Sequence, residues 1–107
     1  MTAPTTLLHV TTAAAWAAGP PSPPQDGFLH LCTPAQLAFV LERHFAGQSG
    51  LVVLHVDAAS LADVRWEASE PGMEPFPHLY GPLPEGAIRW VMRLPPGKAT
   101  QAPPAAG

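Results

Sequence analysis

Proline is the residue that most constrains the fold of this 107-residue chain, because its ring fixes φ and removes a backbone hydrogen-bond donor. The fifteen prolines are unevenly placed, and they break the chain at GPPSPPQDG (residues 19–27) and again from Pro95 onward. The terminal segment PPGKATQAPPAAG holds almost nothing apolar beyond alanine. We therefore predict one folded domain over residues 1–94, followed by a Pro/Ala-rich disordered tail over residues 95–107.

Between these segments, the apolar pattern predicts an α+β domain with a compact core of about six short strands and two helices. The helices are expected at TTAAAWAAG (11–19), which has a threonine N-cap, and after Thr33. The strands are expected at TTLLHVT (5–11), GFLHLCT (27–33), LVVLHVD (51–57), DVRWE (63–67), HLY (78–80) and AIRWVMRL (87–94).

Three local patterns are specific. Thr33, Pro34 and Gln36 form a capping box with proline at the first helical position, and Gly47 ends the helix that follows. LVVLHVD is almost continuously apolar, which is typical of a central strand that is covered on both faces. The last strand alternates, so one face is expected to be core and the opposite face to carry arginine: Ile88, Trp90, Met92 and Leu94 against Arg89 and Arg93.

Charge and cysteine content exclude several classes of function. The chain has five Lys and Arg residues and a net charge of −3, so it lacks the basic footprint of a nucleic-acid-binding protein. Cys32 is the single cysteine, so no intramolecular disulfide forms, and a reducing compartment fits. No 18-residue apolar run and no signal peptide are evident. We therefore expect a cytoplasmic protein without nucleic-acid or membrane partners.

Three histidines lie beside core-type residues on predicted strands. His9, His30 and His78 each neighbour leucine or valine, so each is expected to project from the opposite face of its strand. Tyr80 shares the face of His78. A row of this kind predicts a cleft. The alternative is that each histidine is a separate hydrogen-bonded structural residue.

Other candidate residues have simpler interpretations beside the functional one. Glu67 shares a strand face with Arg65, which favours a surface ion pair, although it is also a candidate acid. Cys32 precedes a helix N-terminus, where a thiol can be reactive, but a small buried residue is the simpler reading. His44 and His55 are interpreted as structural. Glu70 and Glu74 precede FPHLYGPLP (76–84), and the sequence does not place them.

A zinc site is the third possibility for His9, His30 and His78, because three histidines with an open fourth position make a catalytic zinc centre. The three residues come from distant segments, and the chain has no HxH or HxxxH pair. The spacing therefore favours no metal.

The order of LLHVTT, DGFLHLCTPAQL, LVVLHVD, VRWE and FPHLYGPLP resembles a small bacterial family known as domain of unknown function 952. The similarity spans nearly all of residues 7–94. This family in turn looks like a compact member of the ADP-ribosyltransferase-like superfamily. That resemblance implies a split β-core that clasps a cleft for NAD.

The same resemblance implies roles for particular residues. His9-Val10-Thr11 matches the first superfamily motif, in which the histidine hydrogen-bonds the ribose next to adenine, and His30 falls near the ring that packs on nicotinamide. The late strand HLYG lacks the usual glutamate, so Glu67 is a candidate substitute. Histidine or tyrosine could serve there instead, as in the RNA 2′-phosphotransferase-like branch, which also uses arginines. The implied catalytic set is His78, Tyr80 and Glu67, and the implied cofactor-binding set is His9, Thr11, His30, Thr33 and Arg43.

Three functions follow as hypotheses. The first is a nucleotide-binding protein for NAD or an ADP-ribose-like ligand, with transferase activity. The second is a ligand-binding or interaction domain that has lost the catalytic glutamate. The third is a histidine-based metal-dependent hydrolase. The sequence leaves the substrate, the acceptor and the oligomeric state open.

Overall fold

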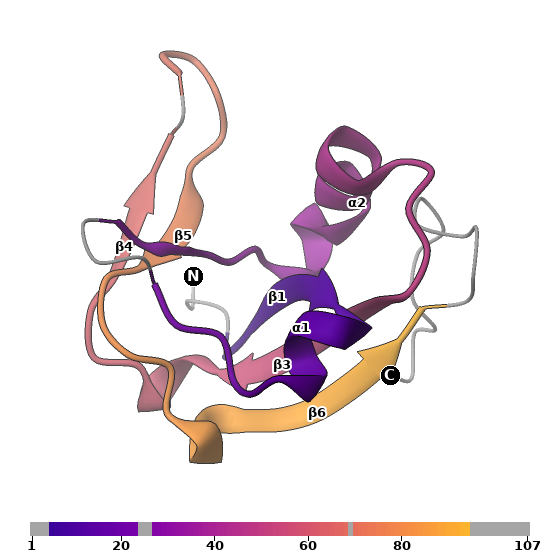
Figure 1. Ribbon diagram of the computed structural model, residues 1–107. Coiled ribbons are helices and arrows are strands. Elements are labelled where there is room, and N and C mark those ends of the chain that lie inside the picture. The colour runs from indigo at the N-terminus through magenta and orange to yellow at the C-terminus, as the bar shows by residue number, and fades with distance from the viewer. Residues whose placement is uncertain (1–4, 24–26, 69, 95–107) are drawn as a thin grey trace.

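The structure is a computed structural model that describes residues 5–23, 27–68 and 70–94, so the tail predicted to be disordered lies outside the described residues. Two antiparallel three-stranded sheets and two helices make up the domain (Figure 1), which confirms the predicted α+β class. The first sheet has the order β1 (Thr6–Thr12), β3 (Leu51–Asp57), β6 (Ile88–Arg93). The second has the order β2 (Leu29–His30), β5 (Phe76–Leu79), β4 (Val64–Glu67).

The two sheets meet where the chain leaves β2. The amide of Leu8 donates to the Cys32 carbonyl at 2.7 Å, and the amide of Cys32 donates back to the Leu8 carbonyl at 2.8 Å. This change of partner ends the pairing of β2 with β5 after His30, so the strand is shorter than the 27–33 predicted. The segment after β2 therefore joins the second sheet to β1.

Strand β3 is the central strand of its sheet, and both of its faces are buried as predicted. Val52, Leu54 and Val56 pack on one face with residues of β2 and β5. Leu51 and Val53 pack on the other face with the α2 helix. These five side chains are at most 1% exposed, so β3 lies at the centre of the hydrophobic core.

Helix α2 (Leu37–Phe45) begins as the capping box predicts. A single 3-10 turn at Pro34–Gln36 precedes it. The Thr33 hydroxyl accepts from the Gln36 amide at 3.1 Å, and the Gln36 side-chain oxygen accepts from the Thr33 amide at 3.0 Å. Gly47, with φ of 78°, follows the end of the helix in the left-handed region that favours glycine.

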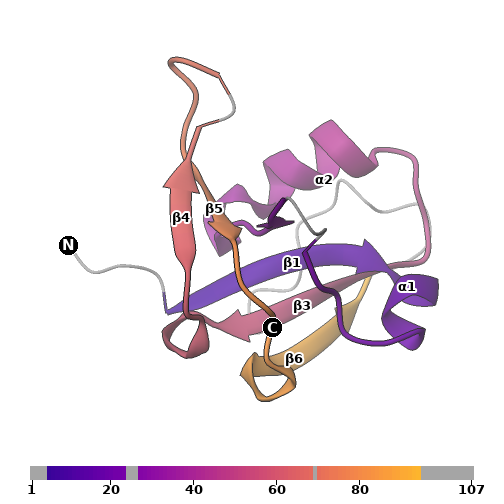
Figure 2. The same cartoon turned by 60° about the vertical axis from the view of Figure 1, so that its left-hand side comes forward.

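Helix α1 (Ala13–Ala17) is capped by the Thr12 hydroxyl, which accepts from the Ala15 amide at 3.0 Å. In Figure 2, α2 lies along one face of the sheet formed by β1, β3 and β6, and β4 and β5 stand beside one end of that sheet. Across residues 5–23, 27–68 and 70–94, neither helix has the length and apolar character that a membrane span requires.

One expectation for β6 is wrong. Trp90 was expected in the core, but it is 54% exposed, and Ile88 and Met92 pack on opposite faces of the sheet. The register shifts between His55 and Val56, so Val56 pairs with Ile88 while His55 pairs with Trp90. The bulge adds one residue to β6 and reverses the alternation from Trp90 onward.

Candidate functional site: a histidine-lined pocket

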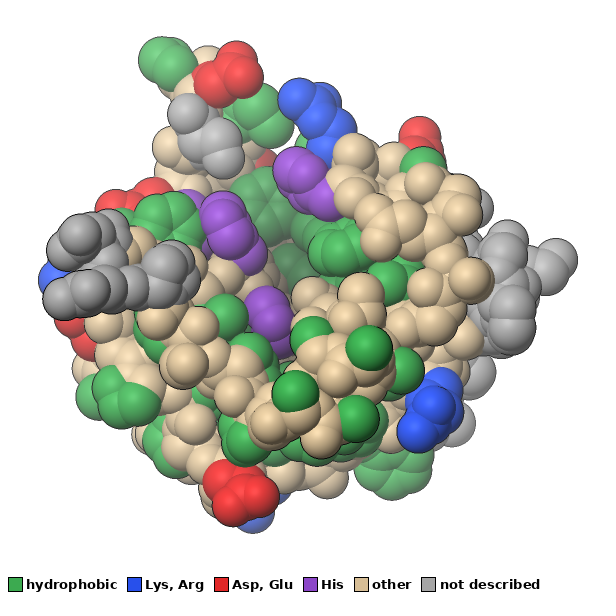
Figure 3. Space-filling model, in the orientation of Figure 1, with side chains coloured by type: hydrophobic (Ala, Val, Ile, Leu, Met, Phe, Trp, Pro, Cys, Tyr) green, Lys and Arg blue, Asp and Glu red, His purple; other side chains and the backbone are tan. Residues whose placement is uncertain are grey.

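A pocket of about 620 Å³ lies where β1, β2, β5, α2 and the loop between β4 and β5 come together. Most of its lining is apolar or aromatic, and four of the five histidines of the chain line it: His9, His30, His44 and His78. Figure 3 shows histidine side chains around a hollow on this face of the molecule. A pocket of this size with a few convergent polar groups is typical of a small-molecule site.

The strands bring three of these histidines together. His30 and His78 form a cross-strand pair between β2 and β5, and their ring centroids are 5.3 Å apart. Nδ1 of His9 bonds to the His30 carbonyl at 2.8 Å. Burial lowers the pKa of the His9 imidazole, and this effect outweighs the hydrogen bond to His30, which raises it.

Phe28 is a pocket residue that the sequence interpretation missed. Its ring stacks on His78 with a centroid distance of 4.0 Å and an interplanar angle of 21°, and it meets His30 edge-on at 4.8 Å. Phe28 and His30 are two residues apart, so the alternation that placed His30 could have placed Phe28 beside it. The stack leaves His78 only 5% exposed.

Glu67 links the other two members of the predicted catalytic set. Nδ1 of His78 donates to Oε1 of Glu67 at 2.8 Å, and the Tyr80 hydroxyl donates to the same oxygen at 2.5 Å. Both hydrogen bonds lower the pKa of the Glu67 carboxyl, and the bond from Tyr80 has the larger effect. The carboxylate thus fixes the His78 ring, whose Nε2 has no hydrogen-bond partner in the described part of the chain.

Arg65 does not form the surface ion pair with Glu67 that the sequence favoured. Its guanidinium binds both carboxylate oxygens of Asp63, each at 3.1 Å, and lies 4.1 Å from the centroid of the Tyr80 ring. A planar guanidinium can pair with one carboxylate and stack on a ring at the same time. The Glu67 carboxylate is therefore left to His78 and Tyr80.

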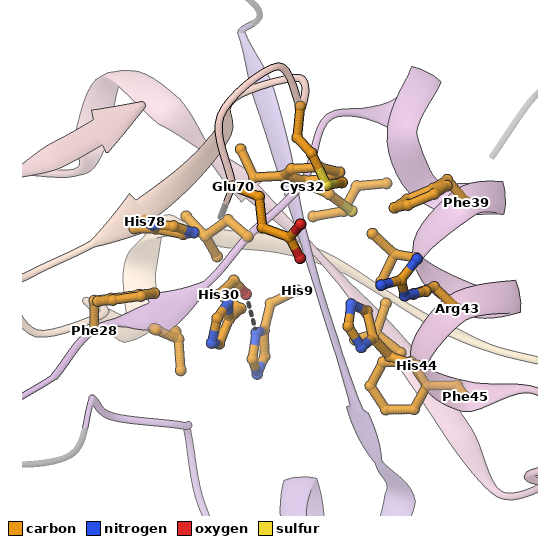
Figure 4. Close-up of a pocket in the computed structure, with 17 residues that line it drawn as sticks. His9, Phe28, His30, Cys32, Phe39, Arg43, His44, Phe45, Glu70 and His78 are labelled. Atoms are coloured by element: carbon orange, nitrogen blue, oxygen red, sulfur yellow. Dashed lines mark hydrogen bonds between the residues drawn. The ribbon is translucent and has the colours of Figure 1, made fainter. Parts of the chain in front are cut away.

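The residues predicted to bind a cofactor divide into two groups. His9, His30 and Arg43 line the pocket. Thr11 and Thr33 are absent from the described lining, and the Thr33 hydroxyl is engaged in the cap of α2. The family resemblance implied a cofactor-binding role for Arg43, and Figure 4 shows its side chain projecting from α2 toward the pocket.

Cys32 is a buried residue of the pocket lining and is 2% exposed. Burial raises the pKa of the Cys32 thiol to about 12, so the nucleophilic thiolate is scarce at neutral pH. The simpler interpretation of Cys32 as a packing residue accounts for this environment.

The metal hypothesis lacks a ligand set. Within residues 5–23, 27–68 and 70–94, no group of three His, Cys, Asp or Glu side chains is arranged to hold a metal ion. The described residues therefore give the metal hypothesis no geometric support.

Tyr80 provides a direct test of the Glu67 contacts, because it is the only tyrosine of the chain. Its hydrogen bond to the Glu67 carboxylate raises the pKa of the phenol above its ordinary value of 10.0. Glu67→Gln removes the charge, so the Tyr80 titration is expected to shift to lower pH. Tyrosinate absorbance measured against pH reports this shift. Glu74→Gln, which removes a carboxylate from the neighbouring loop, is the control, and equal midpoints for Glu67→Gln and wild type would contradict the contact.

The fold and the site together define a small α+β domain in which two antiparallel sheets meet at a histidine-lined pocket. The chain belongs to the family described as protein of unknown function (DUF952), whose model matches residues 4–91. Its structure is similar to the crystal structure of protein CC0527 from Caulobacter crescentus, with a TM-score of 0.73 and 33% identity over 85% of this chain and 87% of that one. The solution NMR structure of CC0527 has a TM-score of 0.70 and 34% identity over 84% of each chain. No curated protein matches the chain.

Proposed function

We propose that the pocket binds NAD or an ADP-ribose-like nucleotide and that His78 acts there as a general base. The observation that carries this proposal is the hydrogen-bonded set of Glu67, His78 and Tyr80, of which His78 also lines the pocket. A carboxylate on Nδ1 of a histidine orients the ring and leaves Nε2 to exchange a proton with a ligand. This is the arrangement that acid–base chemistry at a pocket wall requires.

The pocket lining supports a nucleotide-like ligand. Phe28 offers an aromatic surface for a planar ring, and Arg43 offers a guanidinium for a phosphate. His9 holds Nδ1 against a backbone carbonyl, so its Nε2 is the nitrogen available for a ribose hydroxyl. Two small sheets that meet at a pocket also support an ADP-ribosyltransferase-like core, and this is the superfamily that we propose.

The proposed reaction is transfer of the ADP-ribosyl group. The bond between the ribose carbon and the nicotinamide nitrogen breaks, and its electron pair leaves with nicotinamide. A hydroxyl oxygen of the acceptor, or of water, forms the new bond to the same carbon. The proton of that hydroxyl passes to Nε2 of His78, while Glu67 stabilises the imidazolium through Nδ1–H.

A second candidate is nucleotide binding without transfer. Glu67 and Tyr80 lie behind His78 and are not part of the described pocket lining, so only one member of the predicted catalytic set meets a ligand directly. A carboxylate that cannot reach the ribose would not stabilise its positive charge in the transition state. This observation favours a binding domain that retains the fold.

Calorimetry with NAD and ADP-ribose tests the shared part of both candidates. Wild type is expected to bind both ligands, and His9→Ala is expected to weaken binding by about 10-fold, the loss of roughly one hydrogen bond. His55→Ala, which changes a histidine outside this pocket, is the control. No heat and no thermal shift at millimolar ligand would refute nucleotide binding. Chromatography of the NAD sample separates the two candidates, because only transfer or hydrolysis releases nicotinamide.

A further inference from the structure

We call the exposed part of the pocket lining around Arg43, His44 and Glu70 the mouth of the pocket. Arg43 has no ion pair with any residue in the described part of the chain. Arg65 and Arg89, by contrast, are paired with Asp63 and Asp57. The Arg43 side chain projects from α2 toward the pocket (Figure 4). A guanidinium held at a pocket without a carboxylate partner is suited to an anionic group of a ligand.

Glu70 limits the positive charge of this mouth. Its carboxylate projects from the loop between β4 and β5 toward the side of the pocket that carries Arg43 (Figure 4), yet the two side chains form no salt bridge. Their formal charges cancel. A phosphate that enters the mouth therefore meets no net positive charge unless a histidine of the lining is protonated.

His30 and His44 are the exposed histidines of the pocket, whereas His78 is buried beneath Phe28. Partial desolvation of the His30 ring lowers its pKa, and the nearby His78 and His44 imidazoles lower it further. Without a ligand, His30 is therefore mostly neutral at neutral pH. The charged and titratable groups that line the pocket with it come from β1, the segment after β2, β5, α2 and the β4–β5 loop: His9, Cys32, His78, Arg43, His44 and Glu70.

We propose that Arg43, His44 and His30 form a phosphate subsite at the mouth of the pocket, and that His30 takes up a proton when a phosphorylated ligand binds. Arg43 supplies the permanent charge, and protonated His30 supplies the charge that offsets Glu70. His44 of α2 lies beside Arg43 and adds a second imidazole to that of His30. The inference rests on the proposed nucleotide site and names the part of the ligand that this region recognises.

The preferred ligand is a diphosphate ester of a nucleoside. In such a ligand the phosphates face α2 while the ring lies toward Phe28 and His78. An approaching anion favours the protonated form of His30, since opposite charges at close range stabilise one another. Binding should therefore strengthen as the pH falls from 8 to 6, approaching ~10-fold per pH unit for one full proton.

Calorimetry of ADP-ribose at pH 6, 7 and 8 in two buffers of different ionisation enthalpy measures the number of protons taken up. ADP-ribose is chosen because its diphosphate diester does not titrate in this range, whereas a phosphate monoester has a second pKa of about 6. Adenosine is the ligand without phosphate. Sulfate is the free anion, and it also keeps its charge between pH 6 and 8.

We expect ADP-ribose to bind with proton uptake and adenosine to bind without it. His30→Gln should abolish the uptake, and Arg43→Gln should weaken ADP-ribose while leaving adenosine unchanged. The matched controls are His55→Gln and Arg93→Gln, which change the same residue types outside the described pocket lining. Both controls should retain the wild-type uptake.

The outcomes separate this inference from the proposed function. If ADP-ribose binds with an affinity that does not depend on pH, or if His30→Gln retains the uptake, the phosphate subsite is wrong and nucleotide binding stands. If ADP-ribose fails to bind while sulfate binds with uptake that His30→Gln removes, the subsite stands and the nucleotide proposal fails. If neither ligand binds, both are wrong.

Discussion

Replacement of His78 by glutamine is expected to slow nicotinamide release from NAD by roughly 10²–10⁴-fold, the usual contribution of a general base. The glutamine amide can still donate to Glu67 and still fits beneath Phe28, but it cannot accept a proton from an acceptor hydroxyl. The loss should therefore fall on the chemical step. The rate is measured at saturating NAD by chromatography of the released nicotinamide.

The affinity for ADP-ribose distinguishes this effect from misfolding. His78→Gln should bind ADP-ribose within a few-fold of wild type and should keep a cooperative thermal transition. Its matched control is His55→Gln, which should retain the full rate. A wild-type rate in His78→Gln would show that the proton passes elsewhere, and the role of His78 would then be limited to packing against Phe28.

Leu54→Ala is expected to lower the free energy of unfolding by about 2–5 kcal/mol. Leu54 is fully buried in the central strand β3, and the truncated side chain would leave a cavity between β3 and the second sheet. A domain of this size has a stability of roughly 5–15 kcal/mol, so this single change removes a large share of it. Urea denaturation followed by tryptophan fluorescence gives the free energy directly.

The control for this substitution is Val91→Ala. Val91 is the cross-strand partner of Leu54 on β6, yet it is 38% exposed. Surface changes away from special features alter the free energy of unfolding by about 0.5 kcal/mol or less. Val91→Ala removes two methyl groups from a partly exposed side chain, so its effect on the free energy of unfolding should be close to that value. Equal losses in the two variants would mean that the core does not centre on β3.

Local features of the fold were predictable because their causes lie within a few residues. The capping box of Thr33 and Gln36 involves residues three apart, and both of its hydrogen bonds form. The apolar run of β3 predicted burial on both faces, which is observed. The bulge that turns Trp90 outward was missed, because it depends on how β6 pairs with β3 and not on the alternation within β6.

The candidate site was predictable in part. Alternation identified His9, His30 and His78, but it could not place Glu67, which is 11 residues from His78 and 13 from Tyr80. Their contact depends on the antiparallel register of β4 and β5. Glu70 was left unplaced for a similar reason, since a loop residue has no periodic pattern that fixes its direction.

The sequence by itself determined the elements: where helices begin and end, which strand is buried on both faces, and which histidines leave the core face. These properties follow from caps, side-chain periodicity and proline, which act over short stretches. Only the tertiary structure decided that Glu67 binds His78 and Tyr80, that Phe28 covers His78, and that Arg43 and Glu70 flank one pocket. Those contacts join segments that are distant along the chain, so they arise only when the two sheets and α2 pack together.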